Sequence, residues 1–202
     1  IKPSFIARII EDLRQNFDIK DDAEISMECN PATADEEKLA AYRKAGVNRL
    51  SIGAQSFDDQ VLKKLGRIHT ASDITQTIKA ARKSGFENIN LDLMFAVPGL
   101  DGRKWRGTIR KALNARPEHL SFYSLEIAPG TPFYNMVKDG IMAETSPAAD
   151  RRMYSVALDE LEKAGYIHYE ISNSALPHKE CRHNLKYWQL DDYMGFGPGA
   201  HS

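Results

Sequence analysis

Helical and strand-like segments alternate along most of this chain, and that alternation constrains its fold more than any other feature. Three helical segments end with the same signal, a lysine followed two residues later by a glycine, at Lys44-Ala45-Gly46, Lys83-Ser84-Gly85 and Lys163-Ala164-Gly165. Lysine favours the last turn of a helix, and glycine readily adopts the left-handed conformation in which a helix ends. Each of the three sites therefore predicts a helix that leads into a strand.

The helices are predicted by apolar residues at helical spacing. They lie at Ile6, Ile9, Ile10, Leu13 and Phe17, at Trp105, Ile109 and Leu113, and at Met153, Ala157, Leu158 and Leu161. Two helix starts are predicted as well: Thr33 with Glu36 fits a capping box, and Ser146 before Pro147 fits an N-cap. Strands are predicted between the helices, near Ile25, Leu50, Ile89 and Leu120.

Consecutive strand and helix units favour an α/β fold with a parallel sheet. Apolar and polar residues alternate within each strand, as where Met27 and Cys29 flank Glu28. Parallel strands covered on both faces are usually apolar throughout, so a polar face predicts a ligand cavity inside a closed or partial (βα) barrel. No GxGxxG follows a strand, which weighs against an open dinucleotide-binding sheet.

Composition excludes several functions. Lys and Arg total 27 against 28 Asp and Glu, so a net charge of -1 provides no field that attracts nucleic acid. No apolar run approaches the roughly 20 residues of a membrane span, and the first residues do not resemble a signal peptide, which predicts a cytoplasmic location. Cys29 and Cys181 form no CxxC or zinc pattern, so both are expected to be buried.

Three polar residues near predicted strand ends, Glu28, Gln55 and Asp92, are the leading candidates for the cavity, and Arg67 follows the next short helix. Carboxylates and an amide bind hydroxyls and ammonium groups, and arginine binds a carboxylate bidentately. The set suits a zwitterionic, hydroxyl-rich ligand such as a nucleoside that carries an amino acid. The alternative is a polar network that satisfies itself and binds nothing.

Several motifs then point to one family. They are ECNP at 28–31, NRLSIGAQSF at 48–57, GRIHT at 66–70, NINLDLMFAVPG at 88–99, and HYEISNSA followed by CRHNLKYW at 168–188. Together they resemble the radical S-adenosylmethionine (SAM) family of oxygen-independent coproporphyrinogen III oxidase (dehydrogenase) and HemW, over almost the whole chain. The resemblance implies a partial (βα) TIM-like barrel, truncated at the N-terminus. Residues 1–145 would form the barrel portion and residues 146–202 an appended helix, strand and HNxxYW segment.

In that family the matching glutamate, glutamine, arginine and aspartate contact SAM, which implies this role for Glu28, Gln55, Arg67 and Asp92. A further, backbone-type contact is implied at Glu126, a position at which family members differ. Two departures from the family pattern lie beside a strand end, where Ala96 replaces a glycine and Leu100-Asp101 replaces Gln-Thr. Neither departure removes a charged contact.

The family's CxxxCxxC loop, whose thiolates hold a [4Fe–4S] cluster that SAM chelates, has no counterpart in these residues. Ile1 matches the second barrel helix of the family, so the cluster ligands are expected upstream of Ile1. The resemblance implies that the intact protein cleaves SAM reductively to a 5′-deoxyadenosyl radical. This chain by itself is expected to be inactive and to hold no metal.

His183, Tyr187 and Trp188 lie in HNLKYW, which resembles the HNxxYW motif of the HemW branch. HemW-like proteins are regarded as haem chaperones, so the resemblance implies a tetrapyrrole partner. The chemistry agrees, because imidazole ligates haem iron and aromatic rings stack on porphyrins. Without the family, the same segment predicts a helix capped by Asn184, with its aromatic residues packed on the barrel.

Two other functions stay open. One is the oxidase itself, which converts propionates of coproporphyrinogen III to the vinyl groups of protoporphyrinogen IX. The other is a barrel without radical chemistry that binds a small metabolite. A membrane-associated haem acceptor is a candidate partner, nucleic acid is not, and the oligomeric state is open. The remaining histidines lack ligand spacing and are expected to be structural or solvent-facing: His69, His119, His168, His178 and His201.

Overall fold

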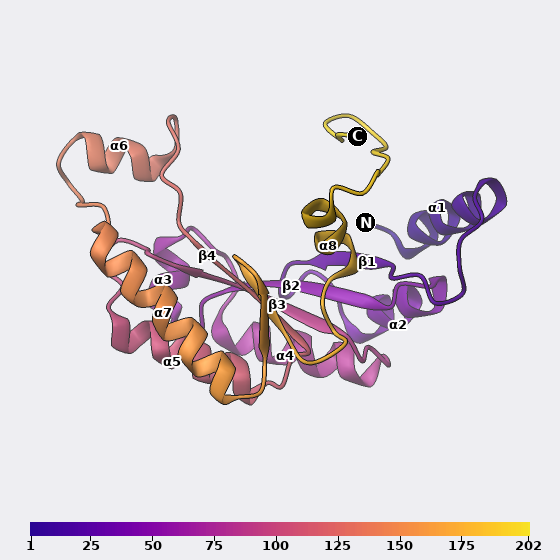
Figure 1. The fold of residues 1–202 in the computed structure, drawn as a ribbon, viewed down its shortest axis with the longest axis horizontal. Helices are drawn as coiled ribbons and strands as arrows, with labels where there is room; N and C mark the ends of the chain where they lie inside the picture. The colour runs from indigo at the N-terminus through magenta and orange to yellow at the C-terminus, as the bar shows by residue number, and fades with distance from the viewer.

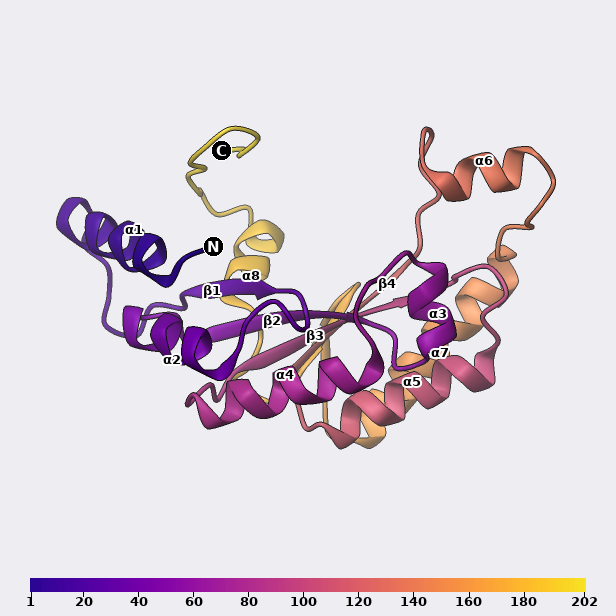
Figure 2. The ribbon, with the colours of Figure 1, turned by 180° about the vertical axis from the view of Figure 1, so that it is seen from behind.

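The computed structural model describes residues 1–202 as a twisted, open six-stranded sheet with helices packed along one face (Figure 1). The elements are α1 (Pro3–Asn16), β1 (Ser26–Cys29), α2 (Glu36–Ala45), β2 (Arg49–Gln55), α3 (Asp59–Lys64), α4 (Ala71–Lys83), β3 (Ile89–Phe95), α5 (Gly102–Asn114), β4 (His119–Ser124), α6 (Pro132–Lys138), α7 (Pro147–Lys163), β5 (Ile167–Glu170), β6 (Asn173–Ala175) and α8 (Arg182–Gln189). Helices α2, α4, α5 and α7 cover one face of the sheet, and α8 lies over the other (Figures 1 and 2).

The strands are ordered β1-β2-β3-β4-β6-β5, and the first four are parallel. This arrangement confirms the predicted α/β class and the partial barrel. The last two strands form an antiparallel hairpin that adds to β4. One strand was expected in this region, but the chain turns back after Glu170, whose carboxylate accepts a hydrogen bond from the Ser172 amide. The sheet therefore continues across the predicted boundary at residue 145, and the division into two parts stays a prediction.

The predicted helix ends are confirmed. Gly46, Gly85 and Gly165 have φ values of 117°, 85° and 85°, in the left-handed region that favours glycine. The Ser146 side chain caps α7 by accepting a hydrogen bond from the Ala149 amide.

The capping box predicted at Thr33 is wrong. The Thr33 hydroxyl donates to the Asn30 carbonyl and closes a turn after β1, while the Asp35 side chain caps α2. A capping box does form at the start of α4, between Thr70 and Asp73. Aspartate and threonine compete for the same N-cap role over a few residues, so the sequence alone did not separate them.

The apolar face of the parallel strands packs on the covering helices. Leu50, Ile52 and Leu91 are completely buried between the strands and the helices, and Trp105 of α5 is buried with them. Cys29 and Cys181 are buried free thiols, as predicted. None of the helices has the length and apolar character needed to cross a membrane.

Helix α1 was predicted correctly as a helix, but its apolar residues are only partly covered within this chain. Ile10 is the one buried residue of α1, whereas Phe5 and Ile9 are exposed. Phe17 was assigned to the helix and lies just outside it, as the C-cap residue with extended backbone angles. The helix contacts α2 and lies at the edge of the sheet (Figure 2).

Ala96 follows β3 and has a φ of 55°, which explains why glycine would suit this position. The left-handed conformation costs a residue with a Cβ about 1–2 kcal/mol, and glycine costs roughly 0.5–1 kcal/mol more chain entropy on folding. We therefore expect Ala96→Gly to raise the free energy of unfolding by about 0.5–1 kcal/mol, measured by urea denaturation. Ala112→Gly, in the interior of α5, is the control and should be destabilising; the same sign at both positions would contradict the strain argument.

Candidate functional site

The four residues predicted to bind a zwitterionic ligand meet at one place. Glu28, Gln55, Arg67 and Asp92 all line a single cavity of about 540 Å³. Glu28 lies on β1, Gln55 ends β2, Asp92 lies on β3, and Arg67 follows α3. Because parallel strands run in one direction, their C-terminal halves bring residues distant in the sequence to the same edge. We call this space the strand-end cavity.

Gln55 is held in an unusual conformation. Its side chain is buried, its φ is 62°, and its Oε1 atom accepts a hydrogen bond of 3.2 Å from the Tyr123 hydroxyl. Gly53 leaves room beside it, because an added Cβ would lie 3.2 Å from the Gln55 Nε2 atom and 3.3 Å from the Asn30 Oδ1 atom. The wall of the cavity is therefore shaped by a strained glutamine and a glycine.

Tyr123 also lines the strand-end cavity, and the sequence analysis missed it. Burial raises the pKa of its hydroxyl, and the charge of Asp92 acts in the same direction, so the hydroxyl keeps its proton and can donate. The signal was present in the sequence: Ser121 and Tyr123 continue the polar alternation along β4. The apolar residue Leu120 predicts the strand but says nothing of its polar face.

Asp92 is held by Asn90 of its own strand, β3, and by Ser51 of the neighbouring strand β2. Asn90 donates to its Oδ1 atom at 2.7 Å, and the Ser51 hydroxyl lies 3.2 Å from its Oδ2 atom. Burial raises the pKa of the Asp92 carboxyl and the charge of Glu28 adds to this effect, while hydrogen bonds from Asn90, Ser121 and Ser51 act in the opposite direction. A cationic ligand would compensate the partly buried charge.

The other two charged residues of the cavity are free to bind a ligand. Arg67 is exposed and forms no ion pair within this chain, and Glu28 is exposed as well. Glu126 differs from the set, because it is exposed two residues beyond β4 and lines neither this cavity nor the adjoining one. Its contact with SAM stays a prediction.

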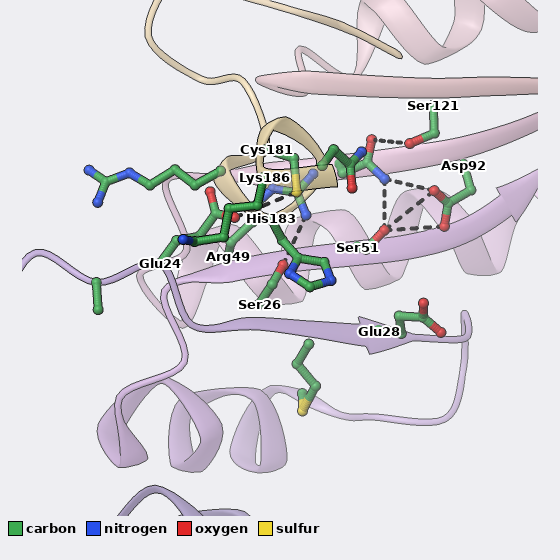
Figure 3. A pocket seen from close by; sticks show the side chains of 15 residues that line it. Glu24, Ser26, Glu28, Arg49, Ser51, Asp92, Ser121, Cys181, His183 and Lys186 are labelled. Carbon is green, nitrogen blue, oxygen red and sulfur yellow. Dashed lines mark hydrogen bonds between the residues drawn. The ribbon is translucent and has the colours of Figure 1, made fainter. Parts of the chain in front are cut away.

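A second cavity of about 710 Å³ adjoins the first and shares Glu28, Ser51 and Asp92 with it. We call it the α8 cavity, since the first turn of α8 forms one wall with Cys181, Arg182 and His183 (Figure 3). The opposite wall consists of the polar faces of β1, β2, β3 and β4, with residues Ser26, Arg49, Asn90 and Ser121 among them. The structure thus brings His183 next to the predicted SAM residues.

Two of the three predicted tetrapyrrole residues lie together. The ring centroids of His183 and Tyr187 are 4.9 Å apart with an interplanar angle of 88°, and Tyr187 stands 4.7 Å from Tyr193. Trp188 is on the same helix but is 55% exposed and belongs to neither cavity. Tyr187 is exposed too.

The alternative prediction for this helix is wrong on both counts. Its aromatic residues are exposed rather than packed on the barrel. The N-cap of α8 is Cys181, not Asn184, and no side chain caps it. The other histidines are placed as predicted: His69 and His119 are buried and hydrogen-bonded, and His168, His178 and His201 are exposed.

The residues present fit SAM and do not fit an iron–sulfur cluster. The strand-end cavity offers two carboxylates, an amide and a guanidinium, which match the hydroxyls, the ammonium and the carboxylate of SAM. A [4Fe–4S] cluster of this kind needs three thiolates, but the chain has two cysteines. Burial raises the pKa of both Cys29 and Cys181, which favours the thiol over the thiolate.

Comparisons with known proteins agree with this geometry. The sequence profile described as "Radical SAM superfamily" matches residues 2–112. The chain is 42% identical to the haem chaperone HemW of Bacillus subtilis (strain 168) over 89% of its length and 47% of that protein, and 38% identical to HemW of Escherichia coli (strain K12) over 96% and 50%. The chain spans about half the length of the curated relatives that it matches.

Among solved structures, the coproporphyrinogen III oxidase HemN of Escherichia coli, described as a radical SAM enzyme, superposes with a TM-score of 0.76. The two sequences are 26% identical, and the match covers 94% of this chain and 43% of HemN.

Proposed function

The chain belongs to the radical SAM superfamily, and from that premise we propose that the protein is a SAM-binding haem chaperone of the HemW type. One observation carries the proposal. The residues suited to SAM line one cavity, and His183 lines an adjoining cavity that shares Glu28, Ser51 and Asp92 with the first. A tetrapyrrole bound at His183 would therefore lie beside the SAM site.

Each polar residue of the strand-end cavity has a role in this proposal. Arg67 binds the carboxylate of SAM through its guanidinium, while Glu28 and Asp92 accept hydrogen bonds from the ammonium group and the ribose hydroxyls. Gln55, oriented by Tyr123, can donate as well as accept. Bound SAM together with an iron–sulfur cluster supplies one-electron chemistry, and the residues of this chain hold and orient SAM.

The tetrapyrrole would be held at the start of α8. The imidazole of His183 is exposed and makes no hydrogen bond within the chain, so either ring nitrogen can ligate iron. Tyr187 stands edge-on against His183 and would contact the porphyrin beside the iron. Trp188 would contribute only if the ligand extends over the exposed side of the helix.

The second candidate is oxygen-independent coproporphyrinogen III oxidase. The superposition with HemN favours it, and both functions use the same cofactors. No specific observation favours a barrel that binds a metabolite without catalysis. A cytoplasmic location, a membrane-associated haem acceptor and the domain division at residue 145 remain predictions within this proposal.

The test uses full-length protein with a reconstituted cluster. We expect it to bind haem, and we expect His183→Ala to weaken haem binding at least about tenfold in an absorbance titration, which corresponds to about 1.4 kcal/mol. The matched control is His178→Asn, because His178 is exposed, lines neither cavity and has a left-handed φ that asparagine tolerates. Equal haem affinity in His183→Ala and the wild type would reject His183 as the ligand.

The same sample separates the two candidate functions. Incubated without oxygen with coproporphyrinogen III, SAM and a reductant, a haem chaperone should form no protoporphyrinogen even though SAM is consumed. Accumulation of protoporphyrinogen IX would instead establish the oxidase and overturn the chaperone proposal. SAM consumption is measured in parallel, so that an inactive sample is recognised.

A further inference from the structure

A continuous chain of hydrogen bonds links α8 to the strand-end cavity through Asn90 and through two residues, His119 and Tyr169, to which no role has yet been given. The Cys181 amide at the start of α8 donates to the Tyr169 hydroxyl at 3.3 Å, and that hydroxyl lies 2.7 Å from the His119 Nε2 atom. The His119 Nδ1 atom lies 2.6 Å from the Asn90 Oδ1 atom, and the Asn90 Nδ2 atom donates to Asp92 at 2.7 Å.

The direction of every bond in this chain is determined. Asn90 must direct its Nδ2 atom toward Asp92, because the opposite orientation would place two oxygens 2.7 Å apart. Its Oδ1 atom can only accept, so the Nδ1 atom of His119 carries a proton. The Nε2 atom of the neutral imidazole then has a free lone pair and accepts from the Tyr169 hydroxyl.

The surroundings keep His119 neutral and Tyr169 protonated, as these hydrogen-bond directions require. His119 is completely buried, and burial together with the charge of Arg49 lowers its pKa to about 3, so the ring is neutral. Burial raises the pKa of Tyr169 to about 12, so its hydroxyl keeps the proton that it donates. The edge-to-face contact of the two rings, with centroids 5.6 Å apart, restricts their movement further.

We propose that His119 is a positioning residue for both cavities. Through Nδ1 and Asn90 it holds the Asp92 carboxylate in the strand-end cavity, and through Nε2 and Tyr169 it holds the first turn of α8, which carries His183. The two ring nitrogens thus act on different ligand sites: Nδ1 on the SAM site through Asp92, and Nε2 on the tetrapyrrole site through α8. The inference rests on the proposed function, because it takes SAM and a tetrapyrrole as the ligands.

Two conservative substitutions in the full-length protein each remove the hydrogen bond of one ring nitrogen and keep that of the other. In His119→Asn the amide nitrogen can occupy the place of Nδ1, which keeps the bond to Asn90 and loses the acceptor for Tyr169. In His119→Gln the longer amide reaches the place of Nε2, which keeps the bond with Tyr169 and loses the bond to Asn90. Both variants place a neutral amide in the same buried site, so each is the control for the other.

Losing one hydrogen bond should change affinity by roughly 2- to 12-fold. We expect His119→Asn to weaken haem binding in that range and to keep SAM affinity within about twofold, whereas His119→Gln should show the reverse. SAM affinity is measured by equilibrium dialysis and haem affinity by absorbance titration. If both variants weaken both ligands alike, His119 serves packing alone and the proposal is wrong.

A third variant covers the case in which neither substitution folds. Tyr169→Phe removes one hydroxyl and keeps the ring, and it should weaken haem binding as His119→Asn does without changing SAM affinity. The matched control is Tyr166→Phe, since Tyr166 is a buried tyrosine whose hydroxyl donates elsewhere, to the Pro117 carbonyl. Unchanged haem affinity in Tyr169→Phe would overturn the proposal that the bond between Tyr169 and His119 positions α8.

The outcomes also distinguish this inference from the function on which it rests. Wild-type protein that binds no haem would reject the chaperone proposal. The effect of His119→Gln on SAM affinity would still test whether His119 positions Asp92 through Asn90. Wild-type protein that binds both ligands, with no separation between the His119 variants, would reject the positioning role and leave the function standing.

Discussion

Replacing Arg67 with alanine in the full-length protein is expected to weaken SAM binding by roughly 10- to 150-fold, because one charge-assisted hydrogen bond contributes about 1.5–3 kcal/mol. Arg67 lines the strand-end cavity, is exposed, and forms no ion pair within the chain. Its removal should therefore cost ligand binding without loss of stability. Equilibrium dialysis with SAM measures the first effect, and thermal unfolding without SAM measures the second.

The controls for this prediction separate charge from geometry. Arg67→Lys keeps the positive charge and loses the bidentate fork, so its SAM affinity should lie between those of the wild type and Arg67→Ala. Arg103→Ala removes an exposed arginine on α5, outside both cavities, and should change nothing. Wild-type SAM affinity in Arg67→Ala would remove Arg67 from the proposed site.

Asp92→Ala should weaken SAM binding by a similar factor and should also affect stability. The substitution leaves the Asn90 amide and the Ser51 hydroxyl without the carboxylate to which they donate. Asn90 still donates to the half-buried Ser51 hydroxyl at 2.7 Å, and both line the α8 cavity, so we expect a loss of stability of about 0.5–1.5 kcal/mol in addition to the loss of affinity. Wild-type SAM affinity in both Arg67→Ala and Asp92→Ala would reject the strand-end cavity as the SAM site.

The second large effect concerns the core. Trp105→Ala is expected to lower the free energy of unfolding by about 3–5 kcal/mol. Trp105 is 1% exposed, its ring lies 5.5 Å from that of Phe95, and its Nε1 atom donates to the Met153 carbonyl at 2.8 Å. The substitution therefore opens a cavity beside β3 and also breaks the hydrogen bond that joins α5 to α7.

Urea denaturation followed by circular dichroism checks this prediction. Arg103→Ala lies on the same helix, is exposed, and should change the free energy of unfolding by no more than about 0.5 kcal/mol. A loss below about 1 kcal/mol for Trp105→Ala would contradict the packing seen between α5, α7 and the sheet.

Much of the site could be predicted from the polar faces of the strands. Glu28 and Asp92 stand at polar positions of β1 and β3, and the structure places both in the strand-end cavity. Tyr123 obeyed the same alternation in β4 and could have been found. His119 could not, because its role depends on Tyr169, which belongs to the antiparallel hairpin and comes near His119 only when that hairpin adds to β4.

The sequence by itself determined the alternation of the first four strands with helices and the left-handed helix ends at Gly46, Gly85 and Gly165, because these depend on side-chain periodicity and on the backbone freedom of single residues. Only the tertiary structure decided that α8 lies over the polar face, so that His183 and Asp92 line one cavity. That arrangement depends on contacts between segments far apart in the chain, and no local pattern of residues encodes which of them will meet.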